Sequence, residues 1–162
     1  MKKLLILAVA IALVGAFATI AFGASPGNTI TTEGSESFQP NNLIQATFRW
    51  SPGSVDVRSG GHLSFVYGNK GQDPHTISIV NQDQLPTTVG QVFNCKVCNQ
   101  ILQIQDGKRR VLGSDGGLNE FGDTVLLTPG QTVNVKVTAP AGTTLYFMCA
   151  IHPWMQGTIY VT

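Results

Sequence analysis

The sequence has few charges, few histidines and few cysteines. Only 12% of its residues are charged, and ten basic residues face nine acidic ones. Two of the basic residues, Lys2 and Lys3, precede an apolar N-terminal run. Without them, eight basic residues face nine acidic ones, so the rest of the chain has no basic excess and we expect no nucleic-acid partner. Three histidines in total are too few for the His-rich clusters of oxidases and reductases that hold several metal ions.

Residues 1–23 have the pattern of an export signal. An uncharged run extends from Leu4 to Phe22, and the small residues Ala21 and Gly23 predict cleavage before Ala24. The run is also long enough to remain as an N-terminal membrane anchor, and this alternative stays open. No cysteine lies near this segment, which excludes bacterial lipid attachment to an N-terminal Cys. In either case we expect an exported protein at the periplasmic or extracellular face of a membrane.

Residues 24–40 differ in composition from the rest of the chain. They are rich in Ser, Thr, Gly and Glu and show no apolar period. Such a stretch cannot bury an apolar face, so the sequence predicts a flexible leader here.

From residue 41 onward, apolar side chains alternate with polar ones over short runs. These runs are Ala46–Trp50, Val55–Val57, Leu63–Tyr67, His75–Ile79, Val133–Val137, Leu145–Cys149 and Ile159–Val161. Gly and Pro between them mark turns, and we find no long helical period with caps. Short strands at this spacing predict an all-β domain over residues 41–162, an antiparallel β-sandwich with Greek-key connections.

One stretch interrupts the alternation of strands and turns. Residues 81–123 are mostly polar and contain the basic pair Arg109 and Arg110. A stretch of about forty residues is too long for an ordinary loop, so we expect an insertion with a short helix or hairpin of its own.

A motif with the spacing C-x2-H-x2-M follows one of these runs. Cys149, His152 and Met155 offer a thiolate, an imidazole and a thioether within one short loop. Copper favours this soft donor set, and a trigonal His2Cys site with a weak axial Met needs one further imidazole. His75 is the better candidate because it opens an alternating run, whereas His62 follows Gly residues at a turn and is expected to face solvent.

With these residues the chain resembles the cupredoxins over most of its length after residue 40. The loop Cys-Ala-Ile-His-Pro-Trp-Met has the length and ending of the ligand loop in amicyanins. The resemblance implies a cupredoxin-like sandwich with one copper ion, Cu(I) or Cu(II), held by His75, Cys149, His152 and Met155. It also implies that electrons pass through a partly exposed His152. Many cupredoxins have Asn directly after the first His ligand, where it ties the two ligand loops together, but this chain has Thr76.

Cys95 and Cys98 remain once Cys149 is assigned as a ligand. In an exported protein they predict a local disulfide that pins the insertion. A redox dithiol or half of a metal site are the alternatives for a C-x2-C pair.

The predicted function follows from the ligand set. Four protein ligands leave no open position for a substrate, so we expect a one-electron carrier and no enzyme. A single Cys in the ligand loop excludes a binuclear copper centre. His152, Pro153 and Trp154 are predicted to form the surface for transient protein redox partners, and the chain is expected to be a monomer. Copper delivery or sequestration is the alternative, but the Met-rich or His-rich motifs of such proteins are missing.

Overall fold

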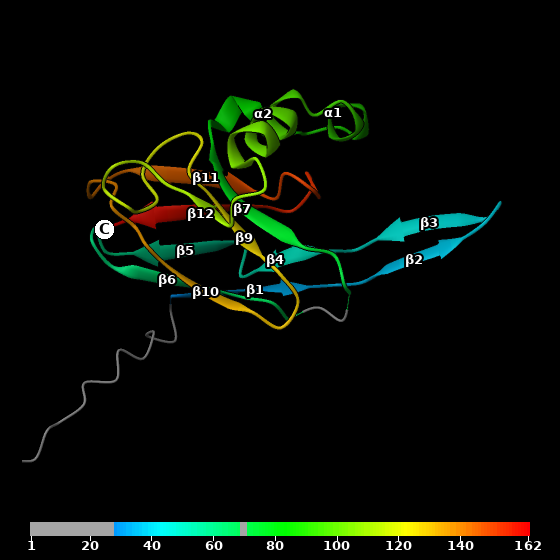
Figure 1. Cartoon of the computed structure of the whole chain (residues 1–162), viewed down its shortest axis with the longest axis horizontal. Coiled ribbons are helices and arrows are strands. Elements are labelled where there is room, and N and C mark those ends of the chain that lie inside the picture. Colours follow the sequence, from blue (N-terminus) through cyan, green and yellow to red (C-terminus); the bar gives the residue numbers. More distant parts are fainter. Residues whose placement is uncertain (1–27, 69–70) are drawn as a thin grey trace, which may run out of the picture.

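The computed structural model of the protein describes residues 28–68 and 71–162, and its described part is built mainly from two β-sheets (Figure 1). One sheet has four strands in the order β10 (Thr132–Lys136), β6 (His62–Val66), β1 (Thr29–Glu33) and β4 (Arg49–Ser51). The other has six in the order β5 (Ser54–Val57), β12 (Gln156–Val161), β11 (Thr144–Met148), β7 (His75–Val80), β9 (Thr124–Leu127) and β8 (Arg110–Val111). The predicted all-β sandwich is confirmed. The predicted signal or anchor at 1–23 lies outside the described residues.

The main core lies between the two sheets. Inward-facing side chains of the four-stranded sheet, such as Leu63 and Phe65, belong to one buried cluster with Leu145 and Phe147 of the six-stranded sheet. Along β11 the alternation that buries Leu145 and Phe147 continues to Cys149, which is also fully buried. The strand pattern therefore places the thiol at one end of the core.

Two strand pairs differ from the predicted antiparallel arrangement. β1 pairs in parallel with β6, and β12 pairs in parallel with β5, while the other pairs are antiparallel. In both parallel pairs the strands are far apart along the chain, so no hairpin imposes an antiparallel pairing.

The prediction of a flexible leader is wrong for most of residues 28–40. β1 is an inner strand of the four-stranded sheet, and Ile30 within it is fully buried. β2 (Glu36–Gln39) then forms a hairpin with β3 (Leu43–Ala46) that projects from one end of the sandwich (Figure 1). The many Thr and Ser residues concealed the strand, because their backbone can pair while only Ile30 and Thr32 need to face inward.

Because β1 lies in the core, replacing Ile by Val should change the free energy of unfolding more in β1 than in the exposed β2–β3 hairpin. Ile30→Val is expected to lower the free energy of unfolding by about 0.5–1.5 kcal/mol, because a buried methylene is lost. Ile44→Val in the exposed β2–β3 hairpin should change it by less than about 0.5 kcal/mol, since Ile44 is 82% exposed. Chemical denaturation of both variants measures the difference. Equal effects would mean that Ile30 lies outside the folded core.

The stretch between β7 and β9 contains two helices. After the 3-10 turn η1 (Gln82–Gln84) come α1 (Val89–Phe93) and α2 (Lys96–Gln105), and both helices lie over the six-stranded sheet (Figure 1). The inner face of α2, with Val97, Cys98 and Ile101, forms a second buried cluster with Val80 of β7 and Met148 of β11.

The expected short helix within the insertion is confirmed, but the sequence did not show the position of α2 by a capped apolar period. Its buried positions Val97, Ile101 and Gln105 follow a four-residue spacing, but one of them is polar. The cap is Cys95, whose sulfur accepts a hydrogen bond from the Cys98 N–H, and Cys is not among the usual capping residues. No helix in the part of the chain that the structure describes has the length and apolar character needed to cross a bilayer.

Candidate metal centre

Two neighbouring strands of the six-stranded sheet position the predicted ligands. His75 is the first residue of β7, and Cys149 directly follows β11, the strand that pairs with β7. The loop from Cys149 to Met155 closes on itself: the Cys149 N–H donates to the Met155 carbonyl at 2.9 Å, and the Met155 N–H donates to the His152 carbonyl at 2.8 Å. These two bonds fold the loop so that its side chains return toward His75.

Three donor atoms converge at this end of the sandwich. The Cys149 sulfur lies 3.9 Å from Nδ1 of His75 and 3.7 Å from Nδ1 of His152, and the two nitrogens are 3.1 Å apart. A zinc-sized ion bonds imidazole nitrogen at about 2.0–2.1 Å and thiolate sulfur at about 2.3 Å, so one ion can contact donors separated by up to about 4 Å. The donor set therefore fits a single metal ion.

The centre is screened from solvent. His75 and Cys149 are fully buried, and His152 is only 8% exposed, less than predicted for a partly exposed ligand. The ring of Phe48 meets both imidazoles edge-on, at centroid distances of 5.3 Å from His75 and 4.9 Å from His152. Trp154 covers the outer side of His152, and the centroids of the two rings are 5.3 Å apart. Aromatic rings thus keep water away from the donor atoms.

Burial and hydrogen bonds act in opposite directions on the thiol. Desolvation raises the pKa of Cys149, whereas backbone N–H groups of Thr76, His152 and Ile151 and the Thr76 hydroxyl favour the thiolate. The N–H groups of Thr76 and His152 each lie 3.3 Å from the sulfur. When a metal ion displaces the thiol proton, these hydrogen-bond donors would therefore already be in place to stabilise the thiolate.

Both imidazoles are held in their neutral, metal-binding form. Burial, together with the neighbouring His152, lowers the pKa of His75 to about 4, although Asp73 acts in the opposite direction. Burial likewise lowers the pKa of His152. Neutral imidazole is the form that binds a metal ion, so neither ring has to lose a proton at neutral pH.

Thr76 makes the connection between the two ligand strands that the sequence left uncertain. Its hydroxyl accepts a hydrogen bond from the Ala150 N–H at 2.7 Å and another from the Ser78 hydroxyl at 2.9 Å. Ser78 in turn shares a 2.8 Å hydrogen bond with Thr124 of β9. Thr76, Ser78 and Thr124 are all fully buried. The tie is thus made by a chain of hydroxyls instead of an amide.

The remaining candidate residues fall into three groups. Met155 is fully buried in the same cluster as Cys149, and its carbonyl also accepts a 3.2 Å hydrogen bond from the Trp50 indole. His62 is exposed on β6, as expected for a residue outside the site. The predicted local disulfide between Cys95 and Cys98 is present, and it links two residues within the insertion.

Sequence reasoning missed the residues that support the ligands. Phe48 and Trp50 were recognised only as a strand pattern, and Ser78 and Thr124 were not singled out. The alternation in β7 placed His75 and Ile77 inward but gave no reason to expect a buried hydroxyl chain. Only the strand order, with β9 beside β7, brings Thr124 to Ser78.

The chain resembles the cupredoxins, as its sequence predicts. No family model matches the sequence, and no curated protein matches it significantly. Solved structures that it matches include an auracyanin from Roseiflexus castenholzii, with 21% identity, a TM-score of 0.47 and coverage of 86% of this chain and 99% of that one. Auracyanin A from Chloroflexus aurantiacus, a "blue" copper protein, has 18% identity, a TM-score of 0.46 and coverage of 83% and 98%. A purple cupredoxin from Nitrosopumilus maritimus has 14% identity, a TM-score of 0.44 and coverage of 83% and 98%.

Proposed function

We propose that this chain is an exported mononuclear type 1 copper protein that carries one electron at a time between redox partners. The observation that carries the proposal is the convergence of Cys149, His75 and His152, whose donor atoms all lie within 4.8 Å of one another in a buried site. A thiolate with two imidazoles is the trigonal donor set of blue copper sites. Met155, buried at the end of the same loop, is the proposed weak axial ligand.

The bound ion would supply a one-electron Cu(I)/Cu(II) couple. The chain's own residues would keep the donor atoms in place in both states. Thr76 ties β7 to the ligand loop, and the backbone bonds between Cys149, His152 and Met155 hold the loop closed. Two backbone N–H groups at the sulfur limit its electron donation, which is one way in which a protein tunes a redox potential.

A carrier role fits the site better than catalysis. With four protein ligands, no coordination position stays open for a substrate. The donor side chains are at least nine-tenths buried, which also disfavours ready transfer of the ion to another protein. Delivery or sequestration of copper is therefore the less favoured alternative.

The proposed contact surface for partners lies over His152. Trp154 is 40% exposed and Ile151 36% exposed, while Pro153 between them is buried. Transient protein redox partners would pack against this apolar surface, close to the proposed ligand His152. We further propose that the chain acts as a monomer outside the cytoplasm, either free or attached through its N-terminal segment.

Copper titration tests the proposed function. Addition of Cu(II) to the purified chain is expected to produce an intense absorption near about 600 nm that saturates at one copper per chain. Reversible one-electron voltammetry and slow loss of copper to a chelator would support a carrier, whereas rapid loss would favour delivery. Copper binding without the intense band would contradict a type 1 site.

A further inference from the structure

The disulfide between Cys95 and Cys98 lies at the start of α2, next to the proposed metal centre but separate from it. The two residues are three positions apart, with their Cα atoms 5.3 Å apart, and Cys95 caps the helix that contains Cys98. A bond that closes so short a loop restricts the unfolded chain little compared with a long-range crosslink. Because it also ties no insertion element to the sandwich, a purely stabilising role explains it poorly.

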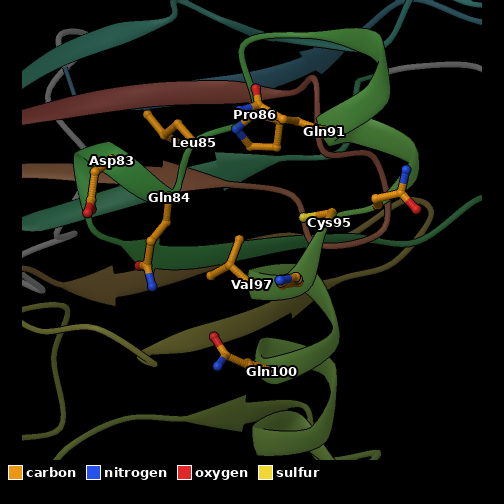
Figure 2. Close-up of a pocket in the computed structure, with 10 residues that line it drawn as sticks. Asp83, Gln84, Leu85, Pro86, Gln91, Cys95, Val97 and Gln100 are labelled. Atoms are coloured by element: carbon orange, nitrogen blue, oxygen red, sulfur yellow. The ribbon is translucent and has the colours of Figure 1, made fainter.

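The two sulfur atoms differ in accessibility. Cys98 is 4% exposed and packs in the second buried cluster with Met148 and Ala150. Cys95 is only partly buried, and Figure 2 shows it among the residues that line a pocket, together with Pro86 and Gln91. Cys95 is therefore the more accessible target for an attacking thiol.

A second hollow that Cys95 also lines gives room for the molecule that would carry such a thiol. This groove of about 540 Å³ is lined by Cys95 and, more deeply buried, Cys98, together with Phe93, Ile151 and Trp154. Phe93 is 83% exposed. The groove is open and has exposed apolar side chains on its walls, so it can accept a polypeptide segment next to the more accessible sulfur.

The surroundings of Cys95 favour a thiolate once the disulfide is opened. Its sulfur accepts the Cys98 N–H at 3.2 Å, at the N-terminus of a ten-residue helix. The first turn of α2 has no acidic residue, and the neighbouring residue is the cation Lys96. Helix N-termini and adjacent cations both stabilise thiolates.

We propose that Cys95 and Cys98 form a redox-active disulfide that exchanges with protein dithiols. A thiolate of the partner attacks the Cys95 sulfur, a mixed disulfide forms, and the Cys95–Cys98 bond breaks as Cys98 leaves as a thiolate and takes up a proton. The second partner thiol then attacks the partner's own sulfur in the mixed disulfide and releases Cys95. Two electrons and two protons have then passed to Cys95 and Cys98, and the partner dithiol has become a disulfide. This activity does not rest on the proposed copper function.

Redox equilibration of the metal-free full-length chain tests the proposal without any substitution. The chain is incubated in buffers of reduced and oxidised glutathione, quenched in acid, unfolded and alkylated. Since the chain has three cysteines, the reduced form carries three alkyl groups and the disulfide form carries one, at Cys149. We expect substantial reduction in buffers that leave the structural disulfides of secreted proteins oxidised. A bond that stays oxidised in all of these buffers would overturn the proposal.

Two matched variants test which sulfur reacts. In Cys98→Ala the freed Cys95 is expected to be alkylated at pH 7 at least about tenfold faster than glutathione, because its thiolate is stabilised. In Cys95→Ala the buried Cys98 should react at least about tenfold more slowly than Cys95 does. Peptide mass identifies the labelled residue in each case. Equal rates for the two cysteines, or a Cys95 no faster than glutathione, would contradict the assignment. Absence of a copper site would leave all these measurements unchanged.

Discussion

Replacing Cys149 by Ser is expected to abolish the intense visible absorption of the copper-loaded protein. The band arises from the bond between copper and a thiolate, and a serine hydroxyl provides no such donor. Cys149 is the free cysteine of the chain, fully buried and within 4 Å of both ring nitrogens. Loss of the sulfur leaves only the two imidazoles of the converging set, so copper affinity should fall as well. Absorption spectroscopy and copper analysis of the same sample separate the two effects.

The matched control replaces the other two cysteines together. Cys95→Ser with Cys98→Ser removes two sulfur atoms without leaving an unpaired thiol, and it should keep the band with its intensity and one copper per chain. Its stability alone should fall, because Cys98 belongs to the buried cluster between α2 and the sheet. A blue Cys149→Ser variant, or a colourless double variant, would contradict the proposed ligand set.

The proposed ligands could be picked out in the sequence because most of them are local in it. Cys149, His152 and Met155 lie in one short loop, so their spacing alone indicates a shared site. His75 lies in a distant strand, but the alternation in β7 indicates which face it takes, and only His62 competed with it. The only long-range step is to place His75 beside this loop. The antiparallel pairing of β7 with β11 brings the two together.

The parts of the fold that escaped prediction have a common physical cause. β1 and α2 are recognisable only by what they pack against. β1 offers the core little beyond Ile30, and its place is fixed by backbone pairing with β6 and β4. α2 is amphipathic, but its buried face includes a cysteine and a glutamine. Tertiary context decided both elements, and a pattern of apolar residues reports that context weakly.

Thr76→Val is expected to have the larger effect of two substitutions that test the tie between the ligand strands. Valine has the same shape as threonine but cannot accept a hydrogen bond, so the Ala150 N–H would lose its partner, while the Ser78 hydroxyl would keep only its bond with Thr124. Leaving this buried N–H unpaired is expected to lower the free energy of unfolding by about 1–3 kcal/mol. Denaturation of the metal-free protein measures this loss.

The matched variant Thr76→Ser keeps the hydroxyl and removes only a methyl group, for which we expect a loss of about 1 kcal/mol. The copper-loaded proteins provide a second readout that a purely structural role would not move. The Thr76 hydroxyl also favours the thiolate form of Cys149, so Thr76→Val should shift the visible band and the redox potential, whereas Thr76→Ser should leave both near their wild-type values. If valine and serine had equal effects on stability and spectrum, the hydroxyl would not be the connection between β7 and the ligand loop. A spectral shift with valine alone would mean that Thr76 sets the electron donation of the sulfur as well as the position of the loop.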